Sequence, residues 1–317
     1  MANTLKMFNS MEIREQVLSN AHSFSDQVSG NQYTLLPNLI GEGGEAQLYE
    51  ATEILTGRKC VAKIDVSGIL GDLTRRKHWE GIVSVLRAHQ NYHEHHLLPL
   101  LAAGALKAQW SDAFLGERAV EIYPFASSGN FADVKLPYAV LRDDVVPALA
   151  TAIDTLHGSG FLHRDIKPEN LLRFDSCFVL SDFSTAVPIG QENRDVFITA
   201  TVRRTVGYSA PEVNFQYASR ACDYFSLGLT LASLYYGGHP LKEAFKCGGD
   251  IAFYRITDSA GFDGLGLTFK ADEIPLAWLI EALTRYQAKD RCDVEGVQLW
   301  LRNPQTFYVK YILANQH

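Results

Sequence analysis

The stretch from Phe161 to Leu172 constrains this chain most, because six polar or ionisable side chains stand between two apolar dipeptides. An aspartate can accept the proton of an attacking hydroxyl, a lysine can neutralise a transferred phosphoryl group, and an asparagine oxygen suits a hard cation such as Mg²⁺. A solvated surface loop does not need this combination. The stretch therefore predicts phosphoryl-transfer chemistry from His163, Arg164, Asp165, Lys167, Glu169 and Asn170.

A second carboxylate follows a short apolar run a little further along the chain. Asp182 stands twelve residues after Asn170, within the sequence Leu180-Ser181-Asp182-Phe183-Ser184. Two oxygen ligands on adjoining segments can clamp a divalent cation. The spacing therefore predicts that Asn170 and Asp182 are metal ligands.

Two features of the first third of the chain point to a nucleotide. The glycine-rich sequence 41–46 lies between apolar runs, is followed by a strand-like segment and has no Gly-Lys-Ser/Thr, which excludes a dinucleotide-binding βαβ turn and a P-loop. We interpret it as a flap over a nucleotide, with an ordinary tight turn as the alternative. Lys63 stands inside an apolar strand and needs an anionic partner unless it reaches water at a sheet edge. Glu80, on a predicted helix, is our candidate partner.

Composition excludes several classes of protein. The chain has 317 residues and a formal charge of −7. It therefore lacks the excess of basic residues that a dedicated nucleic-acid binder carries. No apolar run reaches membrane-spanning length, and the polar N-terminus lacks a signal-peptide core. The 5 cysteines form no CxxC pair, which favours a reducing compartment. We expect a cytoplasmic protein that binds neither nucleic acid nor membrane.

The patterning predicts an α+β chain in two lobes. Helical spacing of apolar residues indicates a leader helix within residues 1–32. Strand-like runs and one prominent helix follow in residues 33–126, which we assign to an N-terminal lobe. Residues 127–317 are mainly helical and form the predicted C-terminal lobe.

These motifs together resemble the eukaryotic-like serine/threonine protein kinases over about residues 33 to 309. They occur in the family's order: the glycine-rich loop, Val61-Ala62-Lys63, the loop from His163 to Asn170, Asp182-Phe183, Ala210-Pro211-Glu212, Asp223 before an apolar helix, and Arg291. The resemblance implies a bilobal fold with an antiparallel sheet and one helix in the smaller lobe. It also implies Mg-ATP as cofactor and proteins bearing Ser or Thr as substrates, with the oligomeric state left open.

Residue roles follow from the same resemblance. Asp165 is the expected catalytic base and Lys167 neutralises charge, while Lys63 pairs with Glu80 and Glu212 pairs with Arg291. Lys167 and Thr205 match the serine/threonine rather than the tyrosine pattern. The implied nucleotide-binding residues, the last two of which also hold Mg²⁺, are Gly41, Glu42, Gly43, Gly44, Leu48, Ala62, Lys63, Tyr123, Pro124, Ala126, Asn170 and Asp182.

Two departures from the family pattern keep other functions open. Ala46 replaces the last glycine of the loop, and Ser184 replaces the glycine that follows Asp-Phe, where glycine permits backbone flips. We infer altered switching with catalysis retained. A pseudokinase scaffold and a small-molecule phosphotransferase on the same fold are the alternatives.

Two further hypotheses concern segments outside these motifs. The histidines at 89, 93, 95 and 96 could suggest a zinc site, but we favour the simpler interpretation of a polar loop in which they are solvated. The segment between Asp182 and Glu212 carries threonines whose phosphates would suit the guanidinium of Arg164. We predict activating autophosphorylation on Thr199 or Thr201.

Overall fold

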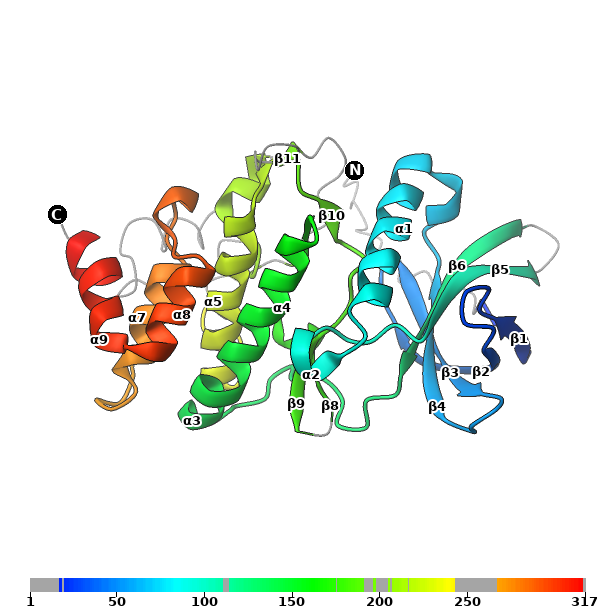
Figure 1. The fold of residues 1–317 in the computed structure, drawn as a ribbon, viewed down its shortest axis with the longest axis horizontal. Coiled ribbons are helices and arrows are strands. Elements are labelled where there is room, and N and C mark those ends of the chain that lie inside the picture. Colours follow the sequence, from blue (N-terminus) through cyan, green and yellow to red (C-terminus); the bar gives the residue numbers. More distant parts are fainter. Residues whose placement is uncertain are drawn as a thin grey trace, which may run out of the picture. The chain divides into compact units, whose positions relative to one another are not determined.

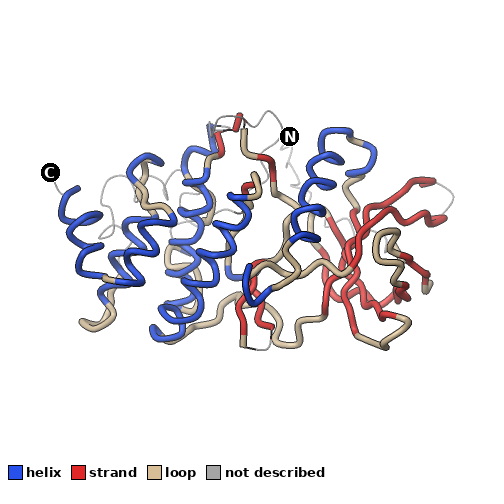
Figure 2. The backbone as a smooth tube through the Cα atoms, viewed as in Figure 1, coloured by secondary structure: helices blue, strands red, loops and turns tan. Residues whose placement is uncertain are grey.

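An antiparallel sheet of six strands holds most of the first part of the chain (Figure 2). Buried and partly exposed side chains alternate along β3 and β4, as a half-buried strand requires. The strands follow the order β1-β2-β3-β4-β6-β5. Their bounds are β1 His22–Ser25, β2 Gln32–Glu42, β3 Ala46–Glu53, β4 Lys59–Asp65, β5 Ala102–Trp110 and β6 Phe114–Pro124.

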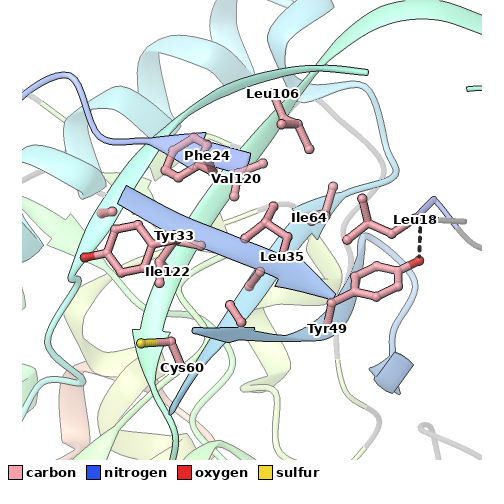
Figure 3. Close-up of a cluster of buried hydrophobic side chains, with 13 residues drawn as sticks. Leu18, Phe24, Tyr33, Leu35, Tyr49, Cys60, Ile64, Leu106, Val120 and Ile122 are labelled. Carbon is pink, nitrogen blue, oxygen red and sulfur yellow. Dashed lines mark hydrogen bonds between the residues drawn. The ribbon is translucent and has the colours of Figure 1, made fainter. Parts of the chain in front are cut away.

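The hydrophobic core of this sheet gathers side chains from all six strands and from the segment before them (Figure 3). Leu35, Tyr49, Ile64 and Ile122 are completely buried in it. Leu18 is equally buried, and its backbone N–H donates to the hydroxyl of Tyr49 at 3.1 Å. Burying this much apolar surface is the main term that stabilises the sheet.

The described part of the predicted leader corrects the sequence-based expectation. Residues 22–25 form strand β1, which pairs antiparallel with β2, and they are not helical. The burial pattern explains this, because Phe24 alone points into the core while its neighbours face outward. Asp26 then closes the turn by accepting from the backbone N–H and the hydroxyl of Ser29 at 2.8 and 2.7 Å. Residues 1–16 and 19 lie outside the described residues.

Helices dominate the rest of the chain (Figure 1). The almost wholly buried α5 lies beside α4, and Arg220 of α5 donates to the carbonyl of His157 in α4 at 3.3 Å. No helix among the described residues is both long enough and apolar enough to cross a bilayer. The helices are α1 Leu73–Ala88, α2 Tyr92–His95, α3 Tyr138–Val140, α4 Val146–Gly158, α5 Arg220–Tyr236, α7 Ile274–Leu283, α8 Val294–Arg302 and α9 Pro304–Phe307.

Short strand pairs connect these helices. β7 pairs with β10, β8 with β9, and β11 with β12, all antiparallel. The β8–β9 hairpin is the longest of the three pairs and carries the two predicted metal ligands next to its ends. The bounds are β7 Phe161–Leu162, β8 Leu171–Phe174, β9 Cys177–Leu180, β10 Val187–Pro188, β11 Val196–Phe197 and β12 Tyr217–Ala218.

This computed structural model describes residues 17–18, 20–110, 114–174, 176–190, 196–197, 205, 207–215, 217–242 and 267–315. These fall into two units, one up to Leu73 with Leu101–Phe125, the other Thr74–Leu100 with the residues from Ala126. The sequence-based division placed 74–100 in the first lobe. The structure groups them with the second unit, where Leu98 donates to the Leu180 carbonyl at 2.9 Å.

Candidate active site

A buried aspartate fixes the backbone that leads into the predicted catalytic loop. The backbone N–H groups of His163 and Arg164 donate to the two carboxylate oxygens of Asp223 at 2.9 and 2.8 Å, and His157 contacts the same carboxylate at 2.8 Å. Burial alone would raise the pKa of Asp223, yet these hydrogen bonds and the nearby imidazoles hold it below its usual value. The first turn of α5 therefore anchors the loop.

The carboxylate of Asp165 is the centre of a tight polar cluster. Lys167 donates to its Oδ2 at 2.7 Å, and the hydroxyl of Thr205 donates to its Oδ1 at 2.6 Å. The amide nitrogen of Asn170 lies 3.0 Å from Oδ2, and Lys167 also reaches the Thr205 hydroxyl at 2.8 Å. Four of the residues singled out from the sequence thus meet in one place, with both carboxylate oxygens of Asp165 oriented by hydrogen bonds.

His163 supports this cluster as a neutral side chain. Burial lowers its pKa below the ordinary histidine value. Its Nε2 lies 3.1 Å from the Ser181 carbonyl, and its Nδ1 lies 3.3 Å from the backbone N–H of Asp165. This pairing assigns the ring proton to Nε2. The ring also packs edge-to-face on Phe183, so it connects the catalytic loop to the segment around Asp182.

Asn170 and Asp182 lie next to the paired ends of β8 and β9. Leu171 pairs with Leu180, and the backbone N–H of Ser181 donates to the Asn170 carbonyl at 2.9 Å. Because the Asn170 amide nitrogen is engaged by Asp165, its side-chain oxygen is the atom suited to a cation. Carboxylate and amide oxygens are the ligands that Mg²⁺ accepts, so the chemistry of this pair fits a Mg²⁺ ion.

The histidine-rich segment does not gather into a metal site. Among the residues the structure describes, no group of three or more His, Cys, Asp or Glu side chains is arranged to hold a metal. His96 instead directs its Nδ1 to the carbonyl of Phe178 at 2.8 Å, and His89 packs edge-to-face on His95. Among the described residues, these contacts do not support the less favoured alternative of a zinc site.

The serine that departs from the family pattern touches the predicted metal ligand directly. The hydroxyl of Ser184 donates to Oδ1 of Asp182 at 2.7 Å. Asp182 itself has a φ of 60°, in the left-handed region that non-glycine residues seldom occupy. Ser184 thus adds a bond that glycine cannot make, and altered switching stays a prediction.

The ion pair expected between Glu212 and Arg291 is present. Two guanidinium nitrogens of Arg291 donate to the two carboxylate oxygens of Glu212 at 2.5 and 2.8 Å. The Arg291 side chain has no exposed surface and lies over the ring of Phe225. This bidentate pair links the segment after Ala210 to the helices that follow.

In the first unit, Lys63 has a carboxylate neighbour that the sequence did not suggest. Its Nζ lies 3.8 Å from Oε2 of Glu121, which stands opposite it on β6. Glu121 is a lone carboxylate in an apolar strand, which the sequence alone could have indicated as unusual. The sequence could not show that Lys63 is its partner, because that depends on the strand register. Glu80 accepts a hydrogen bond from Arg76 at 2.8 Å, and half of its side chain is exposed. The pairing of Lys63 with Glu80 stays a prediction.

Strand register also corrects one predicted nucleotide contact. Ala62 is completely buried in the hydrophobic core, on the face opposite to Lys63. Val61 shares the face of Lys63 and pairs with Tyr123, while Leu48 pairs with Lys63 directly. Side chains alternate between the two faces of a strand, so Val61, and not Ala62, lies on the same face as Lys63.

The glycine-rich turn joins β2 and β3. Gly43 closes it by donating its N–H to the carbonyl of Ala46 at 2.9 Å. Glu42 accepts from the side chain of Gln47 at 3.2 Å, and the oxygen of Gln47 accepts from the backbone N–H of Val17 at 2.9 Å. The segment before β1 is therefore tied to this turn, a connection that nothing in the local sequence indicates.

The remaining predicted positions are as follows. Pro124 ends β6 and pairs with Cys60, and Ala126 begins the part of the second unit that follows the sheet. Gly81 follows Glu80 for a steric reason, since a methyl group there would lie 2.7 Å from the ring of Phe161. Thr199 and Thr201 lie outside the described residues.

Comparison with known proteins agrees with this geometry. A family model described as the protein kinase domain matches residues 125–260. The serine/threonine-protein kinase chk1 of Schizosaccharomyces pombe is 31% identical over 139 residues, which is 42% of this chain and 28% of that protein. Aurora kinase of Saccharomyces cerevisiae is 30% identical over 173 residues, 53% of this chain and 44% of that protein. Putative CBL-interacting protein kinase 13 of Oryza sativa subsp. japonica is 29% identical over 209 residues, 65% and 39% respectively.

Residues 125–260 therefore match a protein kinase domain, and the described chain has an antiparallel sheet in the first unit and a mainly helical second unit. The chain is thus similar to serine/threonine protein kinases over part of its length. Each of the three alignments spans less than half of the relative's own length.

Proposed function

We propose that this protein transfers the γ-phosphoryl group of Mg-ATP to Ser or Thr hydroxyls of protein substrates. One observation carries the proposal, namely the cluster in which Lys167, Asn170 and Thr205 orient the carboxylate of Asp165. A carboxylate held in this way can accept the proton of an attacking hydroxyl. The joint presence of Lys167 and Thr205 supports Ser and Thr as acceptors, in line with the serine/threonine kinases that the chain resembles.

Each of these side chains has a role in the proposed reaction. Asp165 orients the acceptor hydroxyl and takes its proton, while Lys167 offsets the negative charge of the phosphoryl group in flight. Asn170 and Asp182 would hold Mg²⁺, which when bound neutralises charge on the nucleotide phosphates. Lys63 directs its ammonium group to those phosphates. We also expect the glycine-rich turn to approach them with its backbone N–H groups.

Two alternatives receive less support. A pseudokinase scaffold is favoured only by Ser184 and Ala46, yet Asp182 keeps its carboxylate beside the Ser184 hydroxyl. A small-molecule phosphotransferase does not need the segment that ends in Glu212, which here forms a bidentate pair with Arg291. We expect a reducing compartment such as the cytoplasm, because the four described cysteines are free and buried.

Incubation of the purified protein with labelled ATP, Mg²⁺ and generic protein acceptors tests the proposal. We expect label on Ser and Thr, and a rate that falls by about two to four orders of magnitude in Asp165→Asn. Asp143→Asn is the matched control, because that carboxylate lies on the same unit and is 54% exposed. Equal labelling by the wild type and Asp165→Asn would refute the assignment.

A further inference from the structure

A glutamine lies buried on the apolar face of the sheet in the first unit. Gln47 of β3 is completely buried, and it shares its face of the strand with Tyr49 and Ala51, which belong to the hydrophobic core. An amide in such a place costs free energy unless its polar atoms find hydrogen-bond partners. The partners of Gln47 therefore indicate what an amide does at this position.

The oxygen of Gln47 holds the segment that precedes β1. Its Oε1 accepts from the backbone N–H of Val17 at 2.9 Å and from the hydroxyl of Tyr49 at 2.6 Å. Burial raises the pKa of Tyr49, so its hydroxyl keeps the proton that it donates. The same hydroxyl accepts from the backbone N–H of Leu18 at 3.1 Å, and the Leu18 side chain is completely buried in the core (Figure 3). Val17 and Leu18, which we call the docked segment, are thus held by polar and apolar contacts together.

The nitrogen of Gln47 reaches the glycine-rich turn. Its Nε2 donates to Oε1 of Glu42 at 3.2 Å, and Glu42 stands opposite Gln47 in the pairing of β2 with β3. The other end of the turn has a separate attachment, because the carbonyl of Glu45 accepts from the backbone N–H of Val66 at 2.8 Å. The two glycines between these glutamates give the backbone many accessible conformations. Each bond at an end of the turn therefore reduces that freedom.

We propose that Gln47 is a positioning residue for the glycine-rich turn, through which the docked segment strengthens nucleotide binding. This inference rests on the proposed function, in which backbone N–H groups of the turn approach the phosphates of ATP. A turn that is held in place beforehand loses less conformational entropy when the phosphates bind. All the residues of this connection belong to the first unit.

Coupling of this kind acts in both directions. If docking of the segment strengthens nucleotide binding by some factor, nucleotide binding strengthens docking by the same factor. The backbone N–H of Leu18 reports on docking, because it donates to Tyr49 inside the core. Hydrogen exchange at Leu18 should therefore slow by about threefold to tenfold when a non-hydrolysable ATP analogue and Mg²⁺ are added in excess.

Replacement of the amide by an apolar side chain of similar length tests the connection. We expect Gln47→Met to raise the Kd for the analogue, and the KM for Mg-ATP, by about threefold to tenfold, because the turn loses its link to the docked segment. The KM for a protein acceptor should stay unchanged, and the analogue should no longer slow exchange at Leu18. Thr56→Val is the matched control, since it removes a hydroxyl that donates to Glu53 at 2.5 Å in the turn at the other end of β3. It should bind the analogue like the wild type.

A second variant keeps the inference falsifiable if Gln47→Met unfolds, which its melting temperature will show. Tyr49→Phe removes only the hydroxyl that joins Leu18 to Gln47, and it should raise the Kd for the analogue by about twofold to fivefold. The double variant should have the same Kd as Gln47→Met alone, because both substitutions break one connection.

The outcomes are distinguishable. In a protein that transfers phosphate, an unchanged Kd in both single variants overturns this inference alone, and so does exchange at Leu18 that the analogue leaves unaltered. Losses that add in the double variant also overturn it, as does an equal rise of the Kd in Thr56→Val, because the sheet then responds to any lost hydrogen bond. A wild-type protein that neither binds the analogue nor transfers phosphate overturns the proposed function together with the inference.

Discussion

The Glu212–Arg291 pair offers the sharpest test of how this fold is stabilised. Glu212→Ala removes the carboxylate from a guanidinium with no exposed surface. Breaking a buried pair from one side typically destabilises a protein by about 3 to 5 kcal/mol, because the remaining charge is left uncompensated. Arg291 keeps its bonds to the carbonyls of Arg285, Ala221 and Tyr286. We therefore expect the lower end of that range, about 3 kcal/mol.

Thermal unfolding followed by circular dichroism measures this loss. For a chain of this size, about 3 kcal/mol lowers the Tm by roughly 4 to 5 °C. Arg291→Met removes the charge from the other side of the pair. The double variant should be more stable than the sum of the two single losses predicts, by about 1.5 kcal/mol, because the second substitution removes a charge that the first left unpaired.

The control is an arginine–aspartate pair with the same bidentate chemistry at the surface. Arg142 donates to both oxygens of Asp143 at 2.6 and 2.7 Å, and both side chains are about half exposed, at 48% and 54%. Asp143→Ala should leave the Tm unchanged, since solvent screens this pair. The reasoning is refuted if Glu212→Ala shifts the Tm no more than Asp143→Ala does, or if the Glu212 and Arg291 losses simply add.

Three other predictions follow from the structure. Leu18→Ala should destabilise the sheet by about 2 to 4 kcal/mol in urea unfolding, whereas Leu55→Ala, 90% exposed, should have no effect; equal midpoints would contradict the docking of this segment. Burial lowers the pKa of His163, so its stabilising contribution is present above pH 6.5 and is lost as the pH falls through its folded pKa; a His163→Gln variant should lose this part of the pH dependence of Tm, and an unchanged profile would disprove it. Mass spectrometry of the active protein should find phosphate on Thr199 or Thr201, and a rate unchanged by alanine at both positions would exclude an activating role.

The chemistry of the candidate site could be predicted from the sequence because its residues lie in short, contiguous motifs. Asp165, Lys167 and Asn170 fall within six residues of one another, so their meeting requires only a local loop. The carboxylate of Asp182 follows a short strand that pairs with the strand after Asn170. Charged groups between apolar dipeptides have few structural explanations, which makes such a motif specific for function.

The sequence also determined most secondary-structure elements and the two-part organisation, through apolar periodicity. It predicted one prominent helix within residues 33–126, where α1 runs over Leu73–Ala88, and strands from residue 33, where β2 begins at Gln32. It failed at residues 22–25, because the apolar residues before them, from Leu5 to Leu18, follow a roughly helical spacing. Four strand residues with one inward side chain carry too weak a pattern to overrule that signal.

Only the tertiary structure decided which partner each buried polar group meets. The register of β4 against β6 places Glu121 beside Lys63, and it turns Ala62 into the core while Val61 shares the face of Lys63. The same holds for Gln47, whose oxygen receives a backbone N–H from a segment 30 residues earlier. Periodicity shows that a residue is buried, but a shift of one position in strand pairing changes every neighbour across the sheet. The local sequence therefore sets the reactive groups, and long-range pairing sets what surrounds them.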